Sequence, residues 1–337
     1  MTPLIHVRDL TRDYRLIRKR EGVGGGFRDL LRPRHHVLRA VDSVSFDIAA
    51  GEMVGYIGAN GAGKSTTIKM LTGILTPTSG SASVGGLVPW RDRLQYTRHI
   101  GVVFGQRTQL WWDLAVVESY RLLKKIYEVP DKVYDAQMKV FDDLLGIGEF
   151  LHQPVRKLSL GQRMRCDLAA ALLHQPRILF LDEPTIGLDV VAKENVREFL
   201  REIRDLQGVT VILTTHDLND IQQLCRRVII IDKGKVHFDG LLEDLRSRLG
   251  RRVRLDLELR EAVASEDLAR ITTGLPVSWR PNTGKHQVAE FRRAEISGAE
   301  VIKRVVNACP VSDLHLAEPD IEEIVRDIYR AADGEDA

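Results

Sequence analysis

The chain has 337 residues, a formal net charge of +2, 44% hydrophobic residues and 28% charged residues. At roughly 100–200 residues per domain, this length predicts about two domains, and the hydrophobic fraction is ordinary for a globular chain. No uncharged apolar run reaches the roughly 18–20 residues of a membrane-spanning helix, and the first residues lack a signal-peptide pattern. We therefore expect a chain that neither crosses a membrane by itself nor is secreted. The scattered Cys166, Cys225 and Cys309 exclude a disulfide framework and the common zinc motifs, and they favour a reducing compartment.

The near-zero net charge hides two opposed regions. Residues 15–39 contain eight Lys or Arg and two acids, a balance of +6. Residues 318–337 contain eight acids and two Arg, a balance of −6. A solvated surface is the simplest interpretation of both regions.

Apolar segments predict a short strand over residues 4–7 and a second strand over 37–48. A Gly-rich and Arg-rich stretch, residues 17–36, separates them and predicts an inserted surface loop. Further strands are expected at 52–57, 100–104, 178–181 and 209–213, with helices between them. From about 116 to 175 the pattern is mostly helical. Strands that alternate with helices predict an α/β fold with a largely parallel sheet.

The pattern changes after about residue 250. Val253, Leu255, Leu257 and Leu259 alternate as in a half-buried strand. The expected order of elements over residues 251–332 is βαββαβα, and its last helix carries an apolar stripe. This order predicts a small ferredoxin-like α+β accessory domain.

The segment from Gly58 to Ser65 matches G-x-x-x-x-G-K-[ST] directly after one expected strand and at the start of a helix. Its glycines let backbone N–H groups point at phosphate oxygens, and the helix N-terminus adds partial positive charge. The Lys64 ammonium would bind the β- and γ-phosphates, and the Ser65 hydroxyl would bind Mg²⁺. The predicted phosphate-binding residues are Gly58, Asn60, Gly61, Gly63, Lys64, Ser65 and Thr66.

Two acidic residues follow the apolar strand at 178–181. Asp182 would lie at the carboxyl edge of the parallel sheet, facing the phosphate loop, where a nucleotide-held Mg²⁺ needs a carboxylate. Glu183 comes next and is a candidate general base for the attacking water. Together with Lys64 and Ser65, these residues predict a P-loop nucleoside triphosphatase that uses Mg²⁺, but they do not specify which kind.

Further motifs resemble those of the ATP-binding subunits of ABC transporters. Leu158-Ser-Leu-Gly-Gln-Arg163 precedes a helix, and Gly187-Leu-Asp189 follows Glu183. Gln106 and His216 each follow an expected strand. The resemblance covers roughly residues 1–245 and implies an ABC ATPase domain with a helical subdomain at about 107–175. The chain looks most like the ATPase subunits of drug, antibiotic and polysaccharide exporters, and residues 103–113 are similar to a bacterial subgroup with poorly defined or viologen-like substrates.

The resemblance implies a head-to-tail homodimer with ATP between the phosphate loop of one chain and the signature sequence of the other. Ser159, Gly161 and Gln162 would bind the γ-phosphate in trans, and Asp189 would join the two sites. Glu183, His216 and Gln106 would act in hydrolysis, Gln106 also near Mg²⁺ together with Ser65 and Asp182. Tyr14 is the candidate that stacks on adenine, although the 17–36 insertion lengthens its distance from Gly58; a packed edge-strand aromatic is the alternative.

Two residues depart from the family pattern. Leu160 replaces the usual glycine of the signature sequence, and Ile186 stands where a small or hydroxyl residue is common. Neither change removes an expected ligand of ATP or Mg²⁺, so we predict an active ATPase. Trp111 and Trp112 lie where the family receives a helix of the membrane subunit, and they either anchor that contact or fill the core of the helical segment.

We therefore predict the ATPase subunit of an exporter, peripheral at the cytoplasmic face of the cell membrane, with transmembrane permease partners. The basic region near Arg15 could lie beside anionic lipid or beside the partner. A soluble ABC-type ATPase that acts on nucleic acid or ribosomes is disfavoured, because the chain has one cassette, no heptads and no Cys/His clusters; no nucleic acid is expected. An importer ATPase is the other enzyme alternative. A nucleotide-sensing dimerisation module without hydrolysis is disfavoured by the intact Glu183 and His216.

Overall fold

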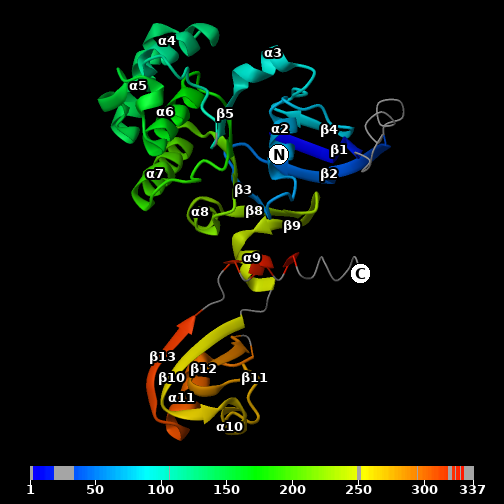
Figure 1. Cartoon of the computed structure of the whole chain (residues 1–337), viewed down its shortest axis with the longest axis vertical. Coiled ribbons are helices and arrows are strands. Elements are labelled where there is room, and N and C mark those ends of the chain that lie inside the picture. Colours follow the sequence, from blue (N-terminus) through cyan, green and yellow to red (C-terminus); the bar gives the residue numbers. More distant parts are fainter. Residues whose placement is uncertain are drawn as a thin grey trace, which may run out of the picture. The chain divides into compact units, whose positions relative to one another are not determined.

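The computed structural model describes residues 3–18, 34–105, 107–248, 252–293, 295–317, 321–322, 324–326 and 328–329. The chain separates into two compact units, Met1–Asp239 and Gly240–Ala337 (Figure 1). The boundary falls before residue 245, the expected end of the first domain, because helix α9 (Leu242–Arg248) groups with the second unit. Within the described residues, no helix is long and apolar enough to cross a bilayer.

A six-stranded sheet in the order β5-β6-β7-β3-β8-β9 lies at the centre of the first unit. The pairs β5–β6, β6–β7, β7–β3 and β3–β8 are parallel. Every residue of β3 and β7 is buried, and burial on both faces is typical of strands in parallel sheets. The strands are Met53–Gly58 (β3), Ile100–Phe104 (β5), Ile178–Asp182 (β6), Thr210–Thr215 (β7), Arg227–Asp232 (β8) and Lys235–Leu241 (β9).

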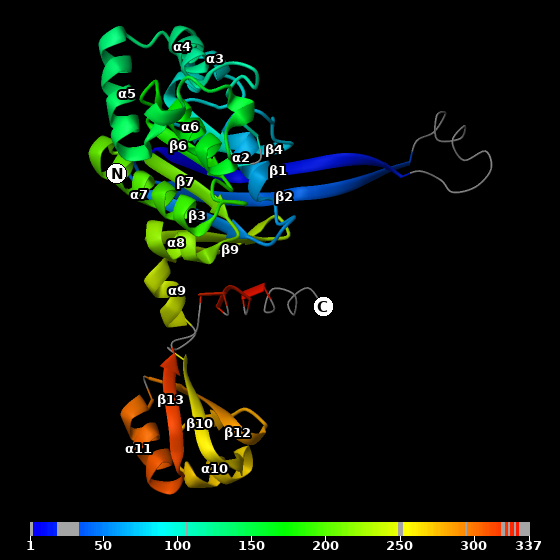
Figure 2. The same ribbon diagram turned by 60° about the vertical axis from the view of Figure 1, so that its left-hand side comes forward.

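Helices connect the parallel strands, and three of them, α4, α5 and α6, gather on one side of the unit (Figures 1 and 2). These three helices correspond to the helical pattern expected between residues 116 and 175. The α-helices of this unit are Lys64–Leu71 (α2), Arg93–Tyr96 (α3), Val116–Ile126 (α4), Asp131–Leu145 (α5), Leu160–Leu172 (α6), Val190–Gln207 (α7) and Leu218–Leu224 (α8). Short 3₁₀ turns are Thr97–His99, Ile147–Phe150 and Val155–Lys157.

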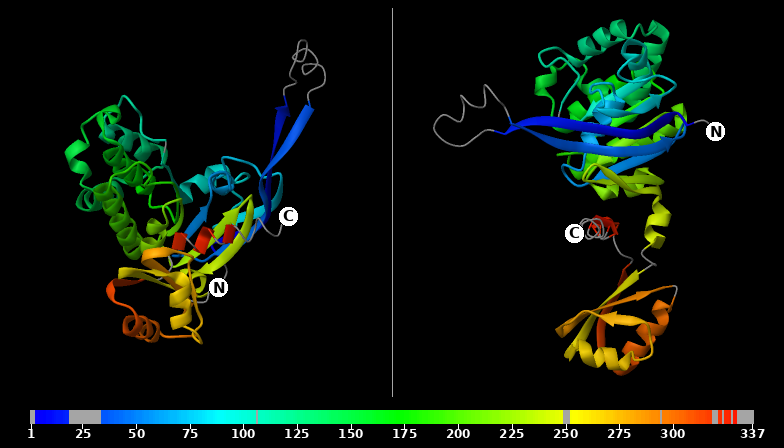
Figure 3. Two further views of the ribbon diagram at one scale, coloured as in Figure 1. Left: turned by 60° about the horizontal axis from the view of Figure 1, so that its bottom comes forward. Right: turned by 90° about the vertical axis from the view of Figure 1, so that its right-hand side faces the viewer.

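A second sheet of the first unit has the order β2-β1-β4, with β1 spanning Ile5–Arg18, β2 spanning Arg34–Ile48 and β4 spanning Ser79–Val84. The expected strand over 4–7 and loop over 17–36 are wrong at their ends, because β1 continues to Arg18 and pairs with a β2 that begins at Arg34. The paired strands extend beyond the rest of the unit (Figures 2 and 3). The outer part of this ribbon has no buried face to impose an alternating apolar pattern, since Leu16, Val37 and Leu38 are each about half exposed.

The second unit contains an antiparallel sheet in the order β11-β12-β10-β13. Its elements follow one another as βαββαβ, the ferredoxin-like arrangement. The apolar side chains that alternate along β10 are buried against helices α10 and α11. The elements are Arg252–Ala264 (β10), Ser265–Ile271 (α10), Val277–Trp279 (β11), Thr283–Arg292 (β12), Gly298–Ala308 (α11) and Val311–Ala317 (β13). In the last segment, the described residues from 321 to 329 are helical.

A buried ion pair joins α7 to α8 behind the central sheet. Arg197 is 5% exposed, and its guanidinium donates at 2.7 Å to the carboxylate of the fully buried Asp220. The Thr185 hydroxyl donates to the same carboxylate at 2.5 Å. Because Thr185 lies two residues after Glu183, this pair fixes the segment that leaves the end of β6.

We expect Arg197→Met to destabilise the first unit by about 3–5 kcal/mol, because it leaves the Asp220 carboxylate buried without a counter-charge. Urea-induced unfolding measures the change. Arg201→Met is the matched control on the same helix, since Arg201 is 35% exposed with Glu194 as its partner, and its expected cost is below about 1 kcal/mol. Equal costs for the two variants would contradict the prediction.

Candidate nucleotide-binding and catalytic site

The phosphate loop connects β3 to α2 with a backbone that only glycine adopts readily. Gly63 has a φ of 106° at the N-cap of α2, and an added Cβ would lie 2.5 Å from the carbonyl oxygen of Ala40 in β2. A side chain at this position would therefore push β2 away from the loop. The turn directs the N-terminus of α2, with its partial positive charge, at the space above the sheet edge.

Lys64 supplies the full positive charge of the loop. Its side chain is 6% exposed, and the ammonium donates to the carbonyl oxygens of Gly58 at 2.7 Å and Ala59 at 3.2 Å. Burial lowers the pKa of Lys64, and the nearby charges of Glu183 and Asp182 oppose that shift. The loop thus holds a cation beside the helix N-terminus, which suits a polyphosphate.

Two hydroxyls hold the Asp182 carboxylate at the end of β6. Ser65 donates to its Oδ1 atom at 3.1 Å, and Thr214 of β7 donates to the same atom at 2.6 Å. The parallel register pairs Asp182 with Thr214 directly. Carboxylate and hydroxyl oxygens are the ligands that Mg²⁺ prefers, so Ser65 and Asp182 fit the cation that the sequence predicts there.

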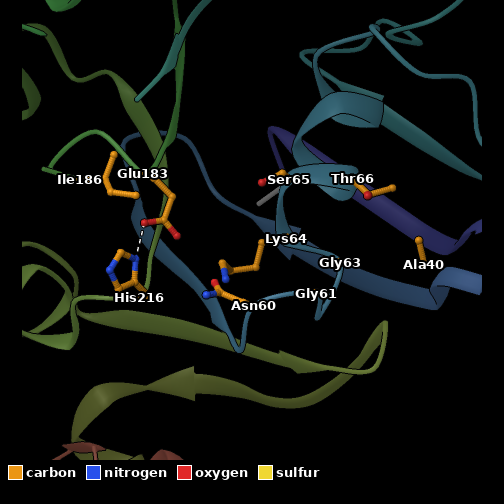
Figure 4. A pocket seen from close by; sticks show the side chains of 10 residues that line it. All are labelled: Ala40, Asn60, Gly61, Gly63, Lys64, Ser65, Thr66, Glu183, Ile186 and His216. Carbon is orange, nitrogen blue, oxygen red and sulfur yellow. Dashed lines mark hydrogen bonds and ion pairs between the residues drawn. The ribbon is translucent and has the colours of Figure 1, made fainter. Parts of the chain in front are cut away.

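Glu183 and His216 form a hydrogen-bonded pair across the pocket from the phosphate loop (Figure 4). The imidazole Nδ1 of His216 lies 2.5 Å from the Glu183 carboxylate. Glu183 has a φ of 57°, which is uncommon for a residue with a Cβ and marks a strained backbone position. Its amide donates at 3.0 Å to the carbonyl oxygen of Thr214, which holds the strained turn in place.

These residues line a cavity of about 530 Å³, within the size range of small-ligand sites. The loop residues lie on one side and Glu183, Ile186 and His216 on the other (Figure 4). The lining consists of Ala40, Asn60, Gly61, Gly63, Lys64, Ser65, Thr66, Glu183, Ile186 and His216. The predicted residues Gly58 and Asp182 lie next to this lining and are bonded to it. Gly58 accepts a hydrogen bond from Lys64, and Asp182 accepts one from Ser65.

Other predicted residues lie elsewhere in the described part of the chain. Ser159 caps α6, and its side chain and that of Gln162 bond each other's backbone amides, but neither residue lines the pocket of its own chain. Asp189 caps α7 by accepting from the Ala192 amide at 2.8 Å. Tyr14 lies opposite Leu38 in the ribbon.

Tyr14 is also absent from the pocket lining, whereas Ala40 of the neighbouring strand belongs to it. The Arg12 guanidinium lies 5.0 Å from the centre of the Tyr14 ring. Gln106 lies outside the described residues, and so does the 19–33 part of the basic insertion. The roles predicted for these residues stay predictions.

The leucine of the signature sequence has a local explanation. An added Cβ at Gly187, whose φ is 71°, would lie 3.0 Å from a methyl group of Leu160. Leu160 thus packs over Gly187, just before Asp189. The substitution fills space within one chain and leaves the Ser159 cap intact.

Besides Ala40 of the pocket lining, sequence reasoning missed two residues that position this site. Thr214 binds Asp182, and Gly105 approaches the backbone of Glu183 so closely that an added Cβ would lie 1.9 Å from its carbonyl oxygen. The Gly105 amide also donates to the Asp182 carbonyl oxygen at 2.8 Å. Both residues follow from the β5-β6-β7 order, which no motif in the sequence specifies.

The parallel sheet, the glycine-rich loop with its lysine and the adjoining carboxylates define a P-loop nucleoside triphosphatase. A family profile described as "ABC transporter" matches residues 41–186. The chain is 33% identical over 209 residues to the ABC transporter ATP-binding protein NatA of Bacillus subtilis, covering 62% of this chain and 85% of NatA. It is 35% identical over 233 residues to the daunorubicin/doxorubicin resistance ATP-binding protein DrrA of Streptomyces peucetius, covering 69% of this chain and 70% of DrrA.

Solved structures agree with this class. A structure titled "Structure of ATP binding subunit of ABC transporter" has a TM-score of 0.62 and 27% identity, covering 73% of this chain and 93% of that one. The dimeric post-hydrolysis state of the ATP-binding cassette MJ0796, bound to ADP and Pi, has a TM-score of 0.59 and 25% identity, covering 71% and 98%. The chain belongs to the ATP-binding family of ABC transporters and is an ATPase.

We expect Lys64→Ala to abolish high-affinity ATP binding, because the loop then lacks the charge that faces the phosphates. Titration calorimetry with ATP measures the loss. Lys69→Ala is the matched control, since Lys69 is exposed on the same helix and leaves affinity unchanged. Unchanged affinity in Lys64→Ala would refute the assignment of the phosphate site.

Proposed function

We propose that the chain is the ATP-hydrolysing subunit of an exporter and powers transport through separate membrane subunits by ATP-driven, head-to-tail dimerisation. The observation that carries this proposal is that the pocket of one chain holds only part of the predicted ATP site. The Lys64 loop and the Glu183–His216 pair face one pocket, whereas Ser159 and Gln162 lie outside it. A second copy of the chain would supply the missing half.

Features of the single chain support such a dimer. Ser159 begins α6 with a complete capping box, so the helix N-terminus and the Gly161 amide can face an anion from a second copy. Val190 and Val191, next to Asp189, are 81% and 71% exposed. Burial of these apolar side chains between two copies would favour association. The dimeric state of the MJ0796 structures supports the same arrangement.

The charged and polar residues at this site would have distinct roles in ATP hydrolysis. Lys64 and the loop amides would bind the phosphates and stabilise the charge that develops on them. Glu183 would accept a proton from the attacking water, and His216, bonded to Glu183, would orient that carboxylate and contact the γ-phosphate. Mg²⁺, held by Ser65 and Asp182, would neutralise phosphate charge when bound. Gln106 would contact the metal or the water.

Two observations support the proposals of export and of a membrane partner. Relatives include proteins named for resistance to linearmycin and to daunorubicin/doxorubicin, which favours an exporter. Trp111 and Trp112 are 40% and 50% exposed, and the Arg163 guanidinium lies 5.5 Å from the centre of the Trp112 ring, so part of each tryptophan is accessible to a permease helix. The chain would then act at the cytoplasmic face of the membrane. The viologen-like substrate stays a prediction.

We expect Glu183→Gln to bind ATP and accumulate as a stable dimer, because the amide cannot accept the proton and ATP holds the two copies together. Size-exclusion chromatography with light scattering, in ATP and Mg²⁺, measures the dimer. Glu183→Gln combined with Lys64→Ala is the control and should stay monomeric. A monomer in both variants would count against ATP-driven dimerisation.

We expect Trp112→Ala to uncouple transport from hydrolysis. The isolated variant should keep its basal ATPase rate within about twofold, whereas transport by the complex with its permease should fall at least about tenfold, since aromatic anchors dominate interfaces. Vesicle transport and phosphate release provide the two readings. Leu94→Ala is the control, because Leu94 is 91% exposed on α3. Aggregation with loss of both activities would instead indicate core packing.

A further inference from the structure

A buried carboxylate has no part in the mechanism described above. It lies in α6, the helix that begins within the signature sequence at residues 158–163 and is called the signature helix below. Asp167 lies in α6, two helical turns after the Ser159 cap, and is 4% exposed. Its neighbours along the helix, including Cys166 and Leu168, are fully buried. Burial raises the pKa of Asp167 to about 6, against hydrogen bonds from Thr108 and Gln109 that lower it. A carboxylate in such surroundings is costly unless its oxygens are bonded.

The Asp167 carboxylate and the Asp167 carbonyl oxygen accept hydrogen bonds from one short segment. The Thr108 hydroxyl donates to Oδ1 at 2.8 Å, and the Gln109 amide donates to the same atom at 3.1 Å. The Gln109 side chain donates to the Asp167 carbonyl oxygen at 2.9 Å. Thr108 also accepts from the Leu110 amide at 3.1 Å, which closes the turn. Three bonds from two consecutive residues therefore converge on one helical position.

The contact between Asp167 and Thr108–Gln109 matters because of where this segment lies in the chain. Thr108 and Gln109 follow Gln106, whose neighbour Gly105 contacts the Glu183 backbone, and they precede the exposed Trp111 and Trp112. On the other side of the contact, α6 is a rigid rod that spans about 12 Å from its cap to Asp167, at ~1.5 Å per residue. A movement of the segment is therefore transmitted to the residues at the cap of α6.

We propose that Asp167 is a positioning residue, which locks Thr108 and Gln109 to the signature helix so that the segment after Gln106 and the half-site at Ser159–Gln162 move as one body. This inference rests on the proposed function for its consequence in the dimer. An apolar residue would fill the same space without desolvating a charge. Unlike an apolar residue, the carboxylate accepts hydrogen bonds from two donors of the facing segment.

The first test uses Asp167→Leu and Asp167→Asn in the Glu183→Gln background. Leucine removes the acceptor and keeps the branching of the side chain, whereas the asparagine oxygen still accepts from Thr108 and Gln109. We expect the ATP-bound dimer of Asp167→Leu to dissociate at least about tenfold more readily in analytical ultracentrifugation, and that of Asp167→Asn to stay within about threefold of the parent. ATP affinity of the monomer should be unchanged in both variants, because Asp167 does not line the pocket.

The facing segment offers a matched pair of variants. Thr108→Val removes the donor at constant shape and should weaken the dimer like Asp167→Leu, whereas Thr108→Ser restores it. Thr108→Val combined with Asp167→Leu should be no weaker than Asp167→Leu alone, since both remove one interaction. Dimerisation at the parent level in Asp167→Leu would overturn the proposal. So would equal losses of dimer, thermal stability and ATP affinity in Asp167→Leu and Asp167→Asn, which indicate a packing role only.

A second measurement separates this inference from the proposed function. Hydrogen exchange of the nucleotide-free chain reports amides 107–110 and 159–163 directly. A lock predicts that both segments are protected in the parent and that Asp167→Leu raises exchange in both by at least about tenfold. Faster exchange in neither segment, or only at 107–110, would refute the lock. If the Glu183→Gln parent fails to dimerise while the exchange result holds, the dimer mechanism fails and the lock stands.

Discussion

The site depends on the parallel order β6-β7-β3, which brings the carboxyl ends of three strands to one edge. The phosphate loop leaves β3 and Asp182 ends β6, so β7 lies between them. Thr214 of β7 bridges that gap by donating to Asp182, which also accepts from Ser65. A carboxylate and a cationic loop two strands apart thus share one hydrogen-bond network.

Backbone contacts, more than side chains, position the catalytic pair. The positive φ of Glu183 aims its carboxylate at His216, and the carbonyl oxygen next to that turn leaves no space for a Cβ at Gly105. The Asp220 carboxylate holds the following turn through Thr185 and Arg197. The strained backbone of Glu183 persists because buried neighbours hold the chain in place on both sides of it.

Much of this site was predictable because its chemistry is local in the sequence. The loop from Gly58 to Ser65 and the pair Asp182–Glu183 each carry a pattern that the structure places around one pocket. Thr214 and Gly105 were not predictable, because their roles depend on which strand lies beside which. The length of the β1–β2 ribbon was not predictable for a different reason. The outer part of the ribbon is exposed on both faces, so cross-strand pairing defines it and hydrophobic periodicity does not.

The residues around Lys64 and those around Ser159 belong to different parts of the first unit. In the proposed dimer, ATP contacts the Lys64 loop of one copy and the Ser159 region of the other. A helix cap alone does not determine where the helix points. Contacts further along α6 do, and Asp167 is the place where α6 is bonded to the segment after β5. At one end of that segment the Gly105 amide bonds the carbonyl oxygen of Asp182, and at the other end Thr108 and Gln109 bond Asp167, so a short series of contacts links the catalytic turn to α6. Such a series would let a change at the γ-phosphate of one site reach the half-site offered to the other.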